Sequence, residues 1–263
     1  DMKTFFAGIC ASAVLIGSSN AVTVNLFPID RGWFDSNDQS LGTTDDNYVA
    51  GEAGTEAQLQ GGGGREFRNF FVFDLSGIGA GLVLGGTLKL LNPNVSEDLL
   101  GEPLPGDNDP IIGNGFYSND PSETYAVTSY TLPGGTSVTD LVDGTPALGI
   151  YANLGTGAAY GSVVVTSLDN PSVINIGLNP TFVTDANAAA GVGRLIIGGR
   201  VTTLDGDLTD TEWVFAWTDL DPTTYTPADG KVVLTLELIP EPSSIGLAGL
   251  GVLLCAFRRR RKS

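Results

Sequence analysis

Residues 67–75 read FRNFFVFDL, and this stretch decides the fold class. Successive side chains of an extended strand point to opposite faces, so the stretch separates into two rows of side chains. The rows are Phe71, Phe73 and Leu75 on one face, and Phe70, Val72 and Asp74 on the other. This period of two, with many aromatic and β-branched residues, predicts a β-strand.

The same pattern recurs along the chain, in runs separated by clusters of Gly, Pro, Asn and Asp. Further strands are predicted at residues 22–27, 87–91, 124–130, 160–167, 172–178, 194–201, 212–218 and 231–239. Roughly ten strands in about 220 residues are typical of an antiparallel β-sandwich or jelly roll. One short helix is expected at residues 181–190, because Asn179 can cap it, Pro180 suits its first position and Gly191 suits its end.

Two segments of the sequence resemble a known pair of strands. Residues 68–78 read RNFFVFDLSGI and residues 85–94 read GGTLKLLNPN. Together they resemble the "FDLS…ATLRL" strand pair of jelly-roll modules in secreted and polysaccharide-associated bacterial proteins. The resemblance covers some 25 residues, so it implies a fold and does not define a ligand.

Composition excludes several classes of function. The chain of 263 residues has 13 Lys and Arg against 30 Asp and Glu, a formal charge of −17, and it has no histidine. Such an acidic chain is unsuited to nucleic acid, whose phosphates require a basic surface. Without histidine, Ser-His-Asp triads, Cys-His dyads and His-ligated zinc are excluded.

The N-terminus has the layout of a secretory signal peptide. Lys3 precedes the apolar run 5–17, and Ser19 and Ala21 occupy the −3 and −1 positions of a cleavage site for signal peptidase. We therefore expect a signal helix within residues 1–21 and a mature chain that begins at Val22. A buried N-terminal helix is the alternative.

The C-terminus has three parts in a fixed order. They are Pro240, Glu241 and Pro242, then the apolar run 245–257, then Arg258, Arg259, Arg260, Arg261 and Lys262. The apolar run is short for a membrane-spanning helix, but snorkelling arginines and local bilayer thinning can extend its reach. The cationic cluster predicts that this end stays in the cytoplasm.

Residues 239–263 resemble the PEP-CTERM sorting signal of Gram-negative bacteria. The resemblance implies recognition by an exosortase, cleavage near residues 240–242 and delivery to the cell surface or an exopolysaccharide matrix. A plain C-terminal membrane anchor is the alternative. The predicted domains are thus a signal peptide at 1–21, a β body at 22–239 and a sorting signal at 240–263.

The body alone is more acidic than the whole chain. Residues 22–239 hold seven Lys and Arg against 28 Asp and Glu, a formal charge of −21. Both cysteines, Cys10 and Cys255, lie in the two ends. The body must therefore be stabilised by core burial or bound ions, without disulfides.

Acidic loops suggest calcium as a possible ligand. The segment DGDLTDTE supplies Asp205, Asp207, Asp210 and Glu212, and carboxylate oxygens on a loop suit Ca²⁺. An acidic, solvated hairpin loop is the alternative. A second candidate loop contains Asp35, Asn37, Asp38, Asp45 and Asp46.

Aromatic and paired acidic residues define two further hypotheses. One face of the strand predicted at 212–218 would hold three aromatic side chains: Trp213, Phe215 and Trp217. Such a row can stack on sugar rings or pack in the core between two sheets, and we expect core packing. Trp33, in a polar stretch, is the better candidate for an exposed aromatic. Glycoside hydrolysis needs two carboxylates in a cleft, and Glu66 and Glu123 are possible members of such a pair without a local motif to support them.

The sequence therefore predicts an exported, non-catalytic protein of the cell surface or extracellular matrix, with a structural or adhesive role. A polysaccharide-binding module, with or without calcium, is the alternative, and a hydrolase is the third possibility. The expected partners are signal peptidase, exosortase and the membrane before processing, with extracellular polysaccharide as a further candidate.

Overall fold

The computed structural model describes most of the predicted body. The described residues are 21–40, 47–54, 64–79, 82–93, 115–134, 137–138, 141, 149–191, 193–207, 209–216 and 230–239. By its internal contacts the chain divides into two compact units, residues 23–238 and the two ends 1–22 with 239–263. The predicted signal helix and the predicted membrane helix at 245–257 lie outside the described residues.

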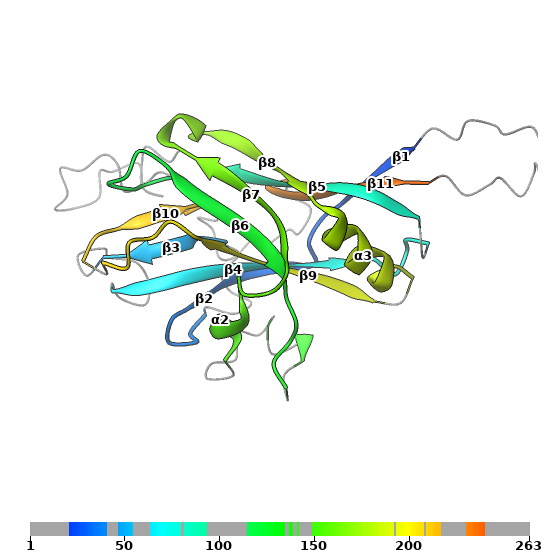
Figure 1. Cartoon of the computed structure of the whole chain (residues 1–263), viewed down its shortest axis with the longest axis horizontal. Helices are drawn as coiled ribbons and strands as arrows, with labels where there is room; N and C mark the ends of the chain where they lie inside the picture. Colours follow the sequence, from blue (N-terminus) through cyan, green and yellow to red (C-terminus); the bar gives the residue numbers. More distant parts are fainter. Residues whose placement is uncertain are drawn as a thin grey trace, which may run out of the picture. The chain divides into compact units, whose positions relative to one another are not determined.

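The body is built from two antiparallel sheets (Figure 1). The smaller sheet has the strand order β1 (Val22–Leu26), β11 (Val232–Leu238), β5 (Val83–Asn92), β8 (Ser172–Leu178). The larger sheet has the order β10 (Glu212–Val214), β3 (Ala50–Ala53), β4 (Arg65–Asp74), β9 (Arg194–Val201), β6 (Glu123–Ser129), β7 (Ala159–Val165), and β2 (Asp30–Asp35) also pairs with β4. The predicted all-β, antiparallel sandwich is confirmed.

The main core lies between the two sheets. Phe71 and Phe73 of β4 pack in it with side chains from both sheets, including Leu88 of β5 and Ile176 of β8. The opposite row of β4, Phe70 and Val72, belongs to a separate buried cluster. The two rows predicted from FRNFFVFDL therefore face two different clusters, and this strand is covered on both sides.

The predicted helix is α3 (Pro180–Ala189). Asn179 caps it, with its side-chain oxygen accepting hydrogen bonds from the backbone N–H groups of Thr181 and Phe182. Phe182 packs edge-on against Tyr160 of β7, with the ring centroids 5.4 Å apart. The structure adds two shorter elements, α2 (Ile150–Asn153) and a 3₁₀ turn at Ser167–Asp169.

The strand predicted at residues 212–218 is wrong in its length. β10 ends at Val214, and Phe215 has a φ of 59°, which breaks the extended conformation. Trp213 and Phe215 are both buried, as expected for core residues, but they belong to different clusters. The expected row of three aromatics on one strand face does not exist, and Trp217 lies outside the described residues.

Gly51 allows β10 to approach β3 closely. Its φ is 141°, and a Cβ atom at this position would collide with the carbonyl oxygen of Glu212 and with Cα of Trp213. Glycine is the residue that accepts both the backbone angle and the missing space. The contact between these two short strands therefore depends on Gly51.

We predict that Gly51→Ala lowers the free energy of unfolding by roughly 2–5 kcal/mol, because it combines a strained backbone angle with a backbone clash. Chemical denaturation measures the change. Gly177→Ala in β8 is the matched control, since a Cβ there meets nothing within 4 Å, and it should change stability by less than about 0.5 kcal/mol. Equal effects of the two substitutions would contradict the role given to Gly51.

Candidate functional site: a buried carboxylate cluster

Two glutamates face each other where β3 meets β10. In the antiparallel ladder Glu212 is directly opposite Glu52, so their side chains project to the same side. Glu212 is 0% exposed and Glu52 is 1% exposed. Two carboxyl groups are thus held side by side away from water.

Three further carboxylates join this pair. One ligand oxygen from each of Glu52, Asp205 and Glu212 lies within 4.8 Å of the other two, and the same holds for Asp120, Glu123 and Glu212. Glu212 therefore belongs to both groups. We call these five residues the carboxylate cluster; it lies at the end of the larger sheet where β3, β10 and the start of β6 meet (Figure 1).

Two hydroxyl groups hold one member of the cluster. Ser118 Oγ donates to Glu123 Oε1 at 2.6 Å and lies 3.4 Å from Glu212 Oε1. Thr203 Oγ1 donates to Glu123 Oε2. Both oxygens of the buried Glu123 therefore have hydrogen-bond donors.

The other two buried carboxylates are incompletely satisfied. Glu52 Oε1 and Glu212 Oε2 are inaccessible to solvent and have no hydrogen-bond partner among the described residues. A buried carboxylate oxygen without a partner is costly, because it has lost its water and gained nothing in return. These two atoms therefore require a ligand or a proton.

The electrostatic environment favours the protonated form of both residues. Burial raises the pKa of Glu52 to about 7, with further contributions from the negative charges of Asp205, Glu66, Asp207 and Glu123. Burial likewise raises the pKa of Glu212 to about 7, with contributions from Glu123, Asp205, Glu52 and Asp120. Without a cation, the cluster holds protons near neutral pH.

The acidic loop predicted to bind calcium is only partly present in this cluster. Asp205 and Glu212 belong to it, whereas Asp207 and Asp210 do not. Asp207 Oδ1 accepts hydrogen bonds from the backbone N–H and hydroxyl of Thr209, and Asp210 Oδ2 accepts one from Asn119. The other three members of the cluster come from distant segments of the sequence: Glu52, Asp120 and Glu123. The spacing of residues within the loop could therefore not predict that they lie beside it.

The second candidate loop uses its carboxylates to shape the chain. Asp35 Oδ1 accepts from the backbone N–H groups of Asn37 and Gln39, and Asp35 Oδ2 pairs with Arg65 at 2.6 Å. Asp38 accepts from the backbone N–H groups of Gly149 and Tyr151 at the start of α2. Asp45 and Asp46 lie outside the described residues.

The other sequence candidates have structural partners. Glu66 Oε1 pairs with Arg68 Nε at 2.9 Å, belongs to neither group of the cluster, and lies opposite Glu52 in the ladder between β3 and β4. Trp33 is only 5% exposed and packs edge-on against Phe67. Trp33 and Trp213 are thus both buried and unavailable for stacking on sugar rings, and Trp217 lies outside the described residues.

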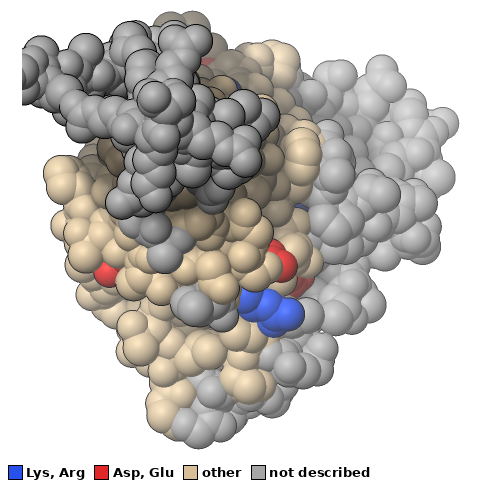
Figure 2. All heavy atoms as spheres, turned by 90° about the vertical axis from the view of Figure 1, so that its right-hand side faces the viewer, with Lys and Arg blue, Asp and Glu red and all other residues tan. Residues whose placement is uncertain are grey.

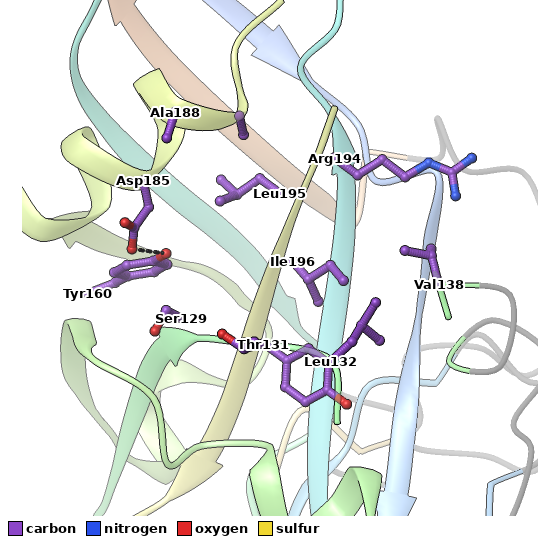
Figure 3. Close-up of a pocket in the computed structure, with 12 residues that line it drawn as sticks. Ser129, Thr131, Leu132, Val138, Tyr160, Asp185, Ala188, Arg194, Leu195 and Ile196 are labelled. Atoms are coloured by element: carbon purple, nitrogen blue, oxygen red, sulfur yellow. Dashed lines mark hydrogen bonds between the residues drawn. The ribbon is translucent and has the colours of Figure 1, made fainter. Parts of the chain in front are cut away.

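A separate hollow lies beside α3 (Figure 3). It has a volume of about 840 Å³, and its lining includes Tyr130, Asp185 and Arg194. Tyr160 donates a hydrogen bond from its hydroxyl to Asp185 Oδ2 at 2.8 Å, and the hydroxyl of Tyr130 has no hydrogen-bond partner among the described residues. The hollow offers polar groups to a small ligand, and it contains no member of the carboxylate cluster.

The geometry of the cluster suits a small cation better than an organic substrate. Three of its carboxylates are fully buried, so a sugar ring has no access to them, whereas a metal ion fits between oxygens that lie within 4.8 Å of one another. Glycoside hydrolysis would require both carboxylates to face a cleft. The cluster is therefore a candidate metal site.

The comparisons with known proteins concern the end of the chain. Residues 238–262 match the family model of the PEP-CTERM protein-sorting motif. A comparison with curated proteins found none that matches this sequence. The resemblance recognised at residues 239–263 is thus confirmed, and the match begins at the last residue of β11.

The motif defines the class of protein. It identifies an exported protein that an exosortase processes, with a C-terminal membrane anchor before processing. A protein with this motif and an all-β body is typically non-catalytic. Within the described part of the chain, we find no helix with the length and apolar character needed to cross a membrane.

We predict that the metal-free protein is more stable at pH 5 than at pH 7.5. Glu52 and Glu212 have an ordinary pKa of 4.5 in the unfolded chain and about 7 in the folded chain. Between these values the folded state binds more protons than the unfolded state, so the free energy of unfolding falls as the pH rises.

Thermal melting in the presence of a chelator tests this prediction. The double variant Glu52→Gln with Glu212→Gln is the control, because it removes both titrating groups and should show a flatter pH dependence in this range. A wild-type melting temperature that increases from pH 5 to pH 7.5 would contradict the assignment.

Proposed function

We propose that this protein is a cell-surface or extracellular-matrix component of a Gram-negative bacterium, in which the β-sandwich has a non-catalytic structural or adhesive role. The observation that carries the proposal is the sorting motif at residues 238–262, attached to an all-β body. The motif accounts for export and processing, and the body is the part that remains after the processing.

The positions of the predicted cleavage sites support this proposal. Cleavage after Ala21 falls immediately before β1, which begins at Val22, and cleavage near Pro240 falls just after β11, which ends at Leu238. Both cuts would leave every described strand intact. The product would be a complete sandwich that no longer carries either membrane-directed segment.

The arrangement of the end strands also favours display of the body. β1 begins and β11 ends at the same end of the smaller sheet, and the carboxylate cluster lies at the opposite end of the body (Figure 1). Charged side chains are sparse on the visible part of the face that Figure 2 presents. The acidic groups of the cluster are thus held at a distance from the end to which the sorting signal is attached.

Recognition of extracellular polysaccharide is a second candidate, favoured by the hollow beside α3. Its polar lining, with Asp185 and Arg194, provides hydrogen-bonding groups for a sugar. Binding of the host exopolysaccharide that is weakened by Arg194→Ala would favour this role, and equal binding by the variant would count against it.

Mass spectrometry of the protein isolated from its host, with and without a functional exosortase, tests the sorting proposal. We expect a chain that begins at Val22 in both strains. Residues beyond the Pro240–Pro242 region should be absent only where exosortase is active, because the enzyme acts on the sorting motif. Retention of residues 240–263 in both strains would refute the proposal.

A substitution in the motif provides a control for this experiment. Replacing Pro240 and Pro242 by Ala should leave the C-terminal segment attached in the exosortase-positive strain. Loss of the segment from this variant would indicate that another protease removes it.

A further inference from the structure

The unsatisfied oxygens of the carboxylate cluster require an explanation. Glu52 and Glu212 are directly opposed across a strand pair, both are buried, and each has an oxygen without a hydrogen-bond partner among the described residues. Like-charged groups directly opposite each other destabilise a sheet unless something lies between them. We propose that Glu52, Asp205 and Glu212 bind a calcium ion.

The unpartnered oxygens distinguish this group from an ordinary acidic patch. Glu52 Oε1 and Glu212 Oε2 cannot be hydrated at the surface, because both side chains are inaccessible to solvent. A divalent cation between them would replace the missing hydrogen-bond donors and would compensate the negative charge of the site. Asp205 completes the group with a third oxygen within 4.8 Å and an exposed position through which water and the ion can enter.

Hydrogen bonding also selects between the two groups that share Glu212. In the second group, Glu123 already accepts hydrogen bonds from Ser118 and Thr203 on its two oxygens. The first group is therefore the binding site, and Glu123 adds negative charge beside it.

The type of ligand points to a hard cation. The chain has no histidine and the body has no cysteine, so the nitrogen and sulfur ligands that zinc prefers are absent from the site. Carboxylates can bind Ca²⁺ through one or two oxygens in flexible geometry, whereas Mg²⁺ requires a tighter octahedron and retains its water. The choice of calcium over magnesium also rests on the proposed export, since calcium sites of extracellular modules commonly have dissociation constants of about 0.1–1 mM.

The ion would link three segments that are far apart in the sequence. Glu52 lies in β3, Glu212 in β10, and Asp205 in the loop that follows β9. β10 is a strand of only three residues at the end of the larger sheet, and on the side away from β3 it is held by one bridge between Trp213 and Tyr117. Calcium would thus secure the edge of the sheet after the protein has left the cytoplasm.

Two measurements on the full chain, purified in detergent and treated with a chelator, test the proposal. Calcium should raise the melting temperature by about 3–10 °C at 10 mM, because the ion binds the folded state. Tb³⁺, which shares the oxygen preference of calcium, should give emission on tryptophan excitation, since Trp213 follows Glu212 directly in the sequence. Calcium should compete this emission away.

Three variants separate a calcium site from a merely structural acidic cluster. Glu52→Gln and Glu212→Gln should each melt at a higher temperature than the wild type in chelator at pH 7.5, and each should lose at least tenfold in calcium affinity. Asp207→Asn is the matched control, because its side chain lies outside the group and keeps an oxygen for Thr209; it should retain the calcium response.

The proposal is overturned if calcium does not change the melting temperature, if the two glutamine variants respond like the wild type, or if magnesium stabilises the protein equally. These results are independent of the fate of the C-terminus. A calcium response in a protein that retains residues 240–263 in its host would leave the metal site standing and reject the sorting proposal alone.

Discussion

The structure depends on a constraint at the edge of its larger sheet: two glutamates must lie opposite each other without water. Gly51 brings the backbones of β3 and β10 close together, and Glu52 and Glu212 then face one another in the ladder. Their mutual repulsion opposes the very pairing that buries them. Relief of this repulsion, by protons or by the proposed calcium ion, therefore stabilises the pairing of β3 with β10.

The periodic strands were predictable, whereas β2 and β3 were not. FRNFFVFDL has alternating rows of large side chains, so it predicted β4 on local pattern alone. β2 reads DRGWFD and has buried Asp30, Arg31 and Asp35. These charges are accommodated by distant partners, such as Arg65 beside Asp35 and the Tyr48 ring beneath Arg31, which a local pattern does not contain. The four residues of β3 are too few to show a period.

The candidate site was likewise only partly predictable from local sequence patterns. The segment DGDLTDTE predicted Asp205 and Glu212 as ligands because its carboxylates are close in sequence. The same proximity also predicted Asp207 and Asp210. In the structure Asp207 accepts a hydrogen bond from Thr209 of its own loop, and Asp210 accepts one from Asn119. Glu52 is about 150 residues before Asp205 and stands alone among small residues. Only the pairing of β3 with β10 makes it a neighbour. The sorting motif, by contrast, is contiguous, and for this reason it was recognisable from the sequence.

The strand order has a mechanical consequence for a protein that has a C-terminal membrane anchor before processing. β11 lies inside the smaller sheet, between β1 and β5, and its residues pair with β5 along its whole length. A pull on Leu238 along the strand therefore loads the hydrogen bonds on both sides of β11 together, in shear, and does not open them one after another as it would at a free edge. The chain is thus attached at a point where the sandwich resists extension.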